Sequence, residues 1–209
     1  TAATGMDALT HAVEAYIGNW GTEYTDSLAL AAVGMIYRNL PTAYADGGNL
    51  AAREQMALAS AYAGMAFTRA NVGNVHAIAH QLGGRYHTPH GLANAIMLPP
   101  VLRFSSSAIE AKLAVLAERA GLARKGDTQE RLAQNFLDSV EAMNRKLGIP
   151  KELDALREED IPELASAACW EADTNYPVPR AMSPGDCEAL LREVLPSGKP
   201  AASKARDRK

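Results

Sequence analysis

Apolar residues recur every three or four positions along most of the chain, the spacing that gathers them on one face of an α-helix. The first such run contains Met6, Leu9 and Val13, and Gly18 follows it as a helix stop. No segment shows the strict apolar–polar alternation that is typical of a β-strand. The pattern predicts an all-α protein with helices over 5–17, 24–40, 50–70, 75–82, 89–98, 106–120, 128–147, 158–173 and 184–194.

Proline and glycine predict several helix boundaries. Pro41 is expected to end the second helix, because proline lacks an N–H group and restricts the residue before it. The pair Gly83–Gly84 is expected to break the fourth helix. In "TPHGLANAIMLP", Thr88 is a suitable N-cap, Pro89 fits the first helical position, and Pro99 is expected to close the helix.

The composition is that of an ordinary globular protein. The 209 residues are 47% hydrophobic, 22% charged and only 6% aromatic, with a net charge of −3. Such a chain is long enough to bury a core of its own. The slightly acidic charge argues against a duplex nucleic-acid partner, and no run approaches the roughly 20 apolar residues of a membrane span.

The cysteines and the two ends of the chain add further expectations. Cys169 and Cys187 lack the spacing of a metal knuckle or redox pair, so we expect two thiols in a reducing cytoplasm. The chain starts with "TAATGMD" and has no signal peptide, which favours a fragment or a processed product. One folded domain is expected over 1–196. The segment 197–209 holds five basic residues, one acidic residue and no apolar anchor, which predicts disorder.

Histidine is concentrated in two places. Four of the five histidines lie within "HAIAHQLGGRYHTPHGLANA", and the fifth lies within "GMDALTHAVEAY". Asp7 and His11 are four residues apart, so they share one face of a helix. His76 and His80 have the same spacing, and His90 opens the next predicted helix. One carboxylate and two or more imidazoles form a suitable shell for Zn²⁺ or Fe²⁺.

Each pair alone is weak evidence for a metal. An isolated Asp–His pair at this spacing is usually a surface or capping interaction. Zinc proteases carry HExxH, in which the glutamate activates water, but Ala77 stands at that place here and argues against protease chemistry. The two pairs and the "PHG" helix together make the metal site the favoured interpretation.

Longer stretches carry a family resemblance. "TGMDALTHAVEAY", "HAIAHQLGGRYHTPHGLANAIMLP" and "NYPVPRAMSPGDCEALLREV" resemble the iron-containing (group III, metal-dependent) alcohol dehydrogenases over residues 1 to 195. In that family, as in the wider dehydroquinate synthase-like superfamily, this region is an all-helical C-terminal domain that binds the metal. The resemblance implies that Fe²⁺ or Zn²⁺ is bound by Asp7, His11, His76 and His90.

The resemblance also implies roles for residues around the metal. His80 matches an additional active-site histidine beside the metal and the nicotinamide, and we expect it to relay the substrate proton; a pocket-lining role is the alternative. Phe67 falls where similar members place a wall of the substrate pocket, and Val72 is expected to face the same pocket. His87 is expected to have a supporting or surface role, because the ligand set is already complete.

One part of the family pattern is missing. The family's N-terminal domain binds the nucleotide through a Gly-Gly-Gly-Ser loop, whereas Gly47–Gly48 and Gly83–Gly84 are flanked by helical sequence and predict turns or caps. The resemblance therefore implies the metal-binding half of an NAD(P)-dependent alcohol dehydrogenase. The metal would polarise the oxygen of a small alcohol or aldehyde, and hydride would pass to or from the nicotinamide. A homo-oligomer is a further expectation.

Other interpretations stay open. A helical His-Asp metallohydrolase is disfavoured, because no histidine is followed by aspartate. A dehydroquinate synthase-like lyase or a glycerol dehydrogenase has a similar helical domain, but "DALTHAVEAY" and "PHGLANA" favour the alcohol dehydrogenases. Maleylacetate reductases tend to carry asparagine at the position of Asp7, so Asp7 argues against that alternative. A non-catalytic metal-binding domain is the last alternative, because the nucleotide-binding loop is missing.

Overall fold

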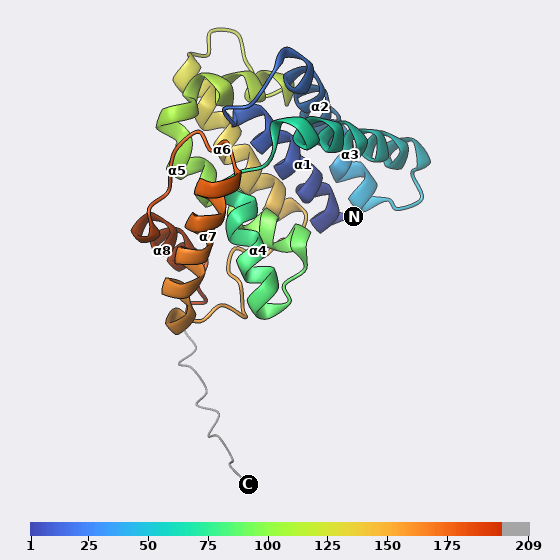
Figure 1. The fold of residues 1–209 in the computed structure, drawn as a ribbon. Coiled ribbons are helices and arrows are strands. Elements are labelled where there is room, and N and C mark those ends of the chain that lie inside the picture. Colours follow the sequence, from blue (N-terminus) through green and yellow to red (C-terminus); the bar gives the residue numbers. More distant parts are fainter. Residues whose placement is uncertain (198–209) are drawn as a thin grey trace.

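The computed structural model describes residues 1–197, which form helices joined by short loops (Figure 1). These residues contain no strand, so the all-α prediction is confirmed. None of their helices is long and apolar enough to cross a membrane. In chain order the elements are α1 (Ala2–Ile17), α2 (Glu23–Ala45), α3 (Leu50–Ala70), α4 (Asn74–Tyr86), α5 (His90–Arg119), α6 (Gln129–Lys146), the 3₁₀ turn η1 (Glu158–Asp160), α7 (Ile161–Asn175) and α8 (Pro184–Glu193).

Helix α1 is the centre of the fold. From Gly5 to Ile17 every residue is buried except Asp7 and His11, because α2, α3 and α5 all pack against this helix. A helix that is apolar nearly all round belongs in the interior, where its few polar residues need partners. The two exceptions therefore mark the place where the core opens to a polar site.

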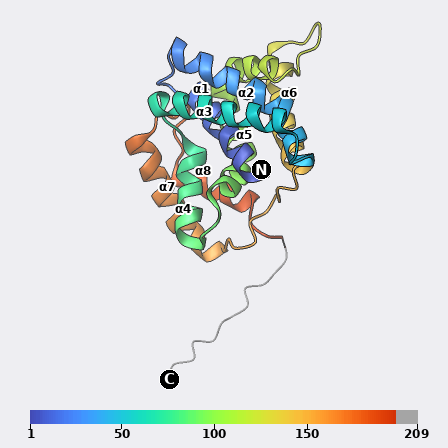
Figure 2. The ribbon, with the colours of Figure 1, turned by 90° about the vertical axis from the view of Figure 1, so that its right-hand side faces the viewer.

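The remaining helices surround α1 in two groups. In the first group, α3 lies across α1 and α2, and α6 packs along α5 (Figure 2). Helices α4, α7 and α8 form the second group, in which α4 contacts both α5 and α7, and α7 contacts α8 (Figure 1). The start of α4 and the start of α5 consequently both reach the polar face of α1.

A long-range contact closes the C-terminal end of α1. The Lys112 ammonium, on α5, donates to the carbonyl oxygens of Tyr16, Ile17 and Gly18 at 3.0–3.2 Å. Those carbonyls lack partners within their own helix, and a cation complements the negative end of the helix dipole. Gly18 is the C-cap, as the sequence predicted.

Two of the predicted helix ends at proline are wrong. Pro41 lies inside α2, and Pro99 lies inside α5, so neither ends its helix. A proline removes one backbone hydrogen bond, but the residue before each of these prolines, Leu40 or Leu98, is completely buried. Tertiary packing of the residue before each proline therefore outweighs the local preference. The backbone interruption in α5 falls instead at Ile109, with φ −126° and ψ 16°.

The connection between α4 and α5 also differs from the prediction. Helix α4 continues through Gly83–Gly84 to Tyr86, because a helical glycine costs only about 1 kcal/mol and the last turn is held by tertiary contacts. It ends at His87, which adopts a left-handed conformation with φ 54° and ψ 30°. Helix α5 begins at His90; Thr88 is not its N-cap, because the extended residue Pro89 occupies that position.

The chain ends agree with the sequence in part. The segment predicted as one helix over 158–173 is divided into η1 and α7. Cys169 and Cys187 are free thiols, buried where α7 meets α8. Of the segment 197–209, only Ser197 lies within the described residues, where its N–H donates to a Glu152 carboxylate oxygen at 3.0 Å. The rest of the predicted disordered tail lies outside them.

Candidate metal centre

Three helices bring a carboxylate and three imidazoles together. Asp7 and His11 project from the same face of α1, and His76 lies in the first turn of α4. His90 is the first residue of α5. Each of these four side chains offers one ligand atom, and all four atoms lie within 4.8 Å of one another. The structure thus gathers the residues that the resemblance named as ligands.

Gly91 allows α5 to start against α1. A Cβ atom added at Gly91 would lie 2.6 Å from the Ala3 carbonyl oxygen and 3.2 Å from the Cβ atom of Asp7. Because the backbone of Ala3 cannot swing away as a flexible side chain can, this close approach requires glycine. The approach places His90 Nε2 3.5 Å from Asp7 Oδ1.

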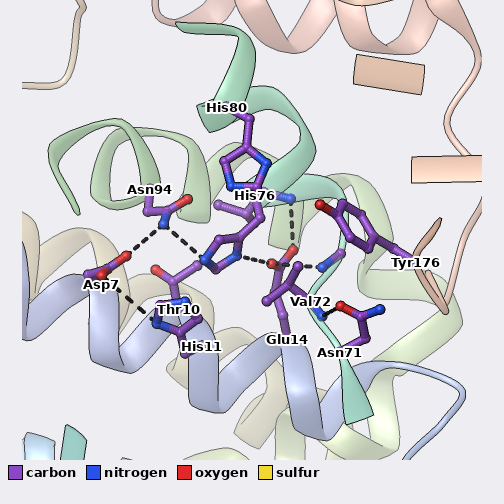
Figure 3. A network of polar contacts seen from close by, with 12 residues as sticks. Asp7, Thr10, His11, Glu14, Asn71, Val72, His76, His80, Asn94 and Tyr176 are labelled. Carbon is purple, nitrogen blue, oxygen red and sulfur yellow. Dashed lines mark hydrogen bonds and ion pairs between the residues drawn. The ribbon is translucent and has the colours of Figure 1, made fainter. Parts of the chain in front are cut away.

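Glu14 orients His76. Its Oε2 atom accepts the Nδ1 hydrogen of His76 at 2.6 Å, and the two side chains are only 3% and 2% exposed (Figure 3). The same carboxylate accepts the main-chain N–H groups of Gly73 at 2.9 Å and Val75 at 2.7 Å. A carboxylate only accepts, so the hydrogen resides on Nδ1 and the lone pair on Nε2. Metal-binding histidines are held in this way by a carboxylate or a carbonyl.

Asn94 joins three of the four candidate ligands. Its Nδ2 atom donates to Asp7 Oδ1 at 2.7 Å and lies 3.1 Å from the Nε2 atoms of both His76 and His90 (Figure 3). The side chain is completely buried, and its Oδ1 atom has no hydrogen-bond partner among the described residues. The amide nitrogen therefore lies next to three of the four ligand atoms, and its directed hydrogen bond is to Asp7.

The electrostatics suit a divalent cation. Burial, assisted by the neighbouring His76, lowers the pKa of His11 to about 4, and burial also lowers the pKa of His90. Both rings are therefore neutral at pH 7 and carry lone pairs. Metal bonds of about 2.1 Å place two ligand atoms on opposite sides of an ion roughly 4 Å apart. The four candidate ligand atoms lie within 4.8 Å of one another, which is close to that separation. A carboxylate with three imidazoles is a donor set that fits Fe²⁺ or Zn²⁺.

Residues 1–195 match the family model described as "Fe-containing alcohol dehydrogenase family, C-terminal". The chain belongs to the iron-containing alcohol dehydrogenase family. It is 45% identical over 197 residues to the 1,3-propanediol dehydrogenase of Klebsiella pneumoniae and 49% identical over 197 residues to that of Citrobacter freundii. Both alignments cover 93% of this chain and 51% of the relative, so the chain spans about half the length of these curated relatives.

The fold agrees with a solved member of the family. The crystal structure of a 1,3-propanediol oxidoreductase matches this chain with a TM-score of 0.90 and 44% sequence identity. The match covers 93% of this chain and 51% of that structure. The helical architecture of this chain is therefore that of the alcohol dehydrogenase family, as the sequence motifs predicted.

The two residues that the family resemblance assigns to the substrate pocket lie differently. The Phe67 ring stacks on His11, with centroids 4.2 Å apart and planes at 18°. Val72 lies in the connection between α3 and α4, is 7% exposed, and donates its N–H to Asn71 Oδ1 at 2.9 Å (Figure 3). Phe67 thus contacts a candidate ligand directly, whereas Val72 presents little surface. Their part in a substrate pocket stays a prediction.

The other two histidines, His80 and His87, differ in their distance from the cluster. His80 stands beside the cluster, with its ring centroid 5.4 Å from that of His90 and 5.9 Å from that of His76. Its side chain is 41% exposed, and its Nδ1 atom lies 2.6 Å from Glu171 Oε1. His87 caps the C-terminus of α4, is exposed, and lies outside the group of four. This agrees with the surface role expected for it.

Sequence reasoning missed three polar residues of the site. Glu14 follows His11 by three residues and Asp7 by seven, so helical spacing alone could have placed it on the same face. Asn94 follows His90 by four residues and shares its face in the same way. Glu171 reaches His80 from a different helix, and no local pattern indicates that contact.

Proposed function

We propose that residues 1–196 form the metal-binding half of an NAD(P)-dependent alcohol dehydrogenase that interconverts small alcohols and aldehydes or ketones. The proposal depends above all on one observation, the four ligand atoms of Asp7, His11, His76 and His90 within 4.8 Å of one another. Membership of an iron-containing alcohol dehydrogenase family supports the same conclusion. The nucleotide would bind mainly to residues that this sequence does not contain.

In this proposal the residues of the site have different roles. The two α1 side chains, His76 and His90 would hold Fe²⁺ or Zn²⁺, while Glu14 keeps the Nε2 lone pair of His76 directed to the ion. Asn94 keeps Asp7 in place through its hydrogen bond to Oδ1. When bound, the ion would supply Lewis-acid polarisation of the substrate oxygen, and the nicotinamide would exchange the hydride.

The substrate and proton roles rest on neighbouring residues. His80 is the proposed proton acceptor, because it lies beside the cluster and is exposed enough to pass a proton to solvent. Phe67 is the proposed apolar wall for the carbon chain of the substrate, since its ring lies next to His11. The relatives named for 1,3-propanediol support a small alcohol as the substrate class.

Metal binding tests the first half of the proposal. The purified chain is stripped with a chelator, reconstituted anaerobically with Fe²⁺ and, separately, with Zn²⁺, and analysed for bound metal. We expect one ion per chain in the wild type and in His87→Ala, and loss of the ion in His76→Ala. Absence of metal from the wild type, or full occupancy in His76→Ala, would contradict the ligand assignment.

Turnover tests the second part of the proposal, the alcohol dehydrogenase activity. Residues 1–196 are joined behind the N-terminal half of the Citrobacter freundii 1,3-propanediol dehydrogenase, and reduction of NAD⁺ or NADP⁺ is followed with short alcohols and diols. We expect alcohol-dependent reduction that disappears in His76→Ala and persists in His87→Ala. A folded chimera that binds metal but reduces neither nucleotide would favour a non-catalytic metal-binding domain instead.

A further inference from the structure

Glu171, on α7, accepts three hydrogen bonds beside the candidate metal centre. His80 Nδ1 lies 2.6 Å from its Oε1 atom, and the Tyr176 hydroxyl donates to the same oxygen at 2.6 Å. Gln81 Nε2 donates to Oε2 at 2.7 Å. The carboxylate is only 19% exposed. It therefore ties two neighbouring residues of α4 to α7 and to the segment that follows α7.

These contacts determine which nitrogen of His80 is free. A carboxylate oxygen only accepts, so the short contact requires the hydrogen on Nδ1 of the neutral ring. The lone pair is then on Nε2, for which no hydrogen bond occurs among the described residues. The His80 ring stacks at 18° on that of His90, so its free nitrogen belongs to a ring that flanks the metal cluster (Figure 3 shows His80 beside His76).

The partners of Glu171 stabilise it as an acceptor. Burial raises the pKa of the Tyr176 hydroxyl, and the adjacent Glu171 raises it further, so this hydroxyl remains a hydrogen-bond donor through the neutral range. The amide of Gln81 donates at any pH. With two donors in place besides the histidine, the carboxylate is held in one orientation relative to α4.

We propose that Glu171 is a positioning residue that fixes His80 in its Nδ1–H tautomer and so presents the Nε2 lone pair at the metal centre. The inference rests on the proposed function for the fate of the proton. Oxidation of an alcohol moves a hydride from carbon to the nicotinamide and releases the hydroxyl proton. His80 Nε2 accepts that proton and passes it to solvent, and in aldehyde reduction the same nitrogen returns a proton to the oxygen.

The tautomer itself can be measured without metal or nucleotide. The chain is labelled with ¹⁵N-histidine, and two-dimensional spectra that correlate ring nitrogens with ring carbon-bound protons are recorded at alkaline pH, where the imidazoles are neutral. We expect His80 in the Nδ1–H form in the wild type. In Glu171→Ala the His80 signals should move toward those of exposed His87 in the same spectrum.

Two further variants separate positioning from simple support of the fold. Glu171→Gln keeps an acceptor oxygen, so it should retain more of the Nδ1–H form than Glu171→Ala does. Asp173→Asn removes an exposed carboxylate two residues along α7 and should leave the His80 signals unchanged. A contact that only joins α4 to α7 would lower thermal stability in Glu171→Ala without changing the tautomer.

The tautomer measurement tests the positioning role of Glu171 independently of the enzyme assignment. His80 in the Nε2–H form in the wild type, or unchanged His80 signals in both Glu171 variants, would overturn it. In the chimera described above, Glu171→Ala should lower kcat about tenfold or more with KM for the alcohol nearly unchanged, and Glu171→Gln should lower it less. Equal kcat in all three proteins would overturn the proton-acceptor step. If the chimera shows no turnover, the tautomer measurement still tests the positioning.

Discussion

Glu14 receives the Nδ1 hydrogen of His76 at 2.6 Å, and the surrounding protein excludes water from both side chains. The carboxylate also caps the N-terminus of α4 by accepting hydrogen bonds from the N–H groups of Gly73 and Val75. One buried residue of α1 therefore fixes both the position of α4 and the direction of a candidate ligand. If the proposed metal centre binds its ion, folding and metal binding are coupled through this contact.

Replacement of Glu14 tests that coupling. In Glu14→Ala two buried N–H groups and the His76 ring lose their acceptor, so we expect the free energy of unfolding to fall by about 2–4 kcal/mol. Metal affinity should fall about 10- to 100-fold, because the ring is no longer held. Chemical denaturation and metal titration measure the two effects. The exposed Glu54→Gln on α3 should change neither, and wild-type metal affinity in a folded Glu14→Ala protein would contradict the account.

Gly91→Ala tests the close approach of α5 to α1. The added methyl would meet the Ala3 carbonyl oxygen at 2.6 Å, so we expect a loss of about 1–3 kcal/mol in stability and weaker metal binding as His90 is displaced. Gly84→Ala is the matched control, because its Cβ would meet nothing within 4 Å and should stabilise α4 by up to about 1 kcal/mol. Thermal unfolding of both variants, with and without metal, checks the pair. Equal stability of Gly91→Ala and wild type would show that α5 can shift freely.

Asn94→Leu separates ligand positioning from stability. Leucine has nearly the same size and removes the unpaired Oδ1 atom together with the three Nδ2 contacts, so the unfolding free energy should change by less than about 2 kcal/mol. Metal affinity should fall clearly, because the Asp7 carboxylate loses the donor that holds it. Calorimetric metal titration and denaturation of the same samples distinguish the two quantities. Unchanged affinity would show that Asp7 needs no such support.

The contact between α4 and η1 predicts a pH dependence. Hydrogen bonds from the Arg85 guanidinium and the Tyr86 hydroxyl hold the pKa of Asp160 below its ordinary value. A lowered pKa in the folded state means that this stabilisation is complete above the ordinary aspartate pKa of about 4 and is lost as the pH falls through the lowered value. Asp160→Asn should therefore be less stable at pH 7 and lose less stability on acidification to about pH 2. Unfolding curves across that range measure the difference, and identical pH profiles would contradict it.

The fold could be predicted from the sequence because its helices are long and strongly periodic. What local patterns could not show is how tertiary burial overrides a helix breaker, as at Pro41, where completely buried Leu40 keeps α2 continuous. The same applies to Gly83–Gly84, where contacts of Tyr86 with Asp160 hold the last turn of α4. Helix existence is thus a local property, whereas helix length depends on the neighbours.

The candidate site divides in the same way. Asp7 and His11 can be placed on one face from their spacing, and motif resemblance adds His76 and His90. Glu171 meets His80 across 91 positions of sequence, and the ring of Phe67 stacks on His11 from another helix. Such contacts depend on how α3, α4 and α7 pack, which no single segment encodes.

Crystals of the chain grown with Fe²⁺ or Zn²⁺, with diffraction recorded on both sides of the metal absorption edge, test the metal centre. We predict one strong anomalous peak bonded to Asp7, His11, His76 and the Nε2 atom of His90, with Glu14 still on Nδ1 of His76. A metal-soaked crystal in which these four side chains remain too far apart to share an ion, or in which the ion binds elsewhere, would contradict the account.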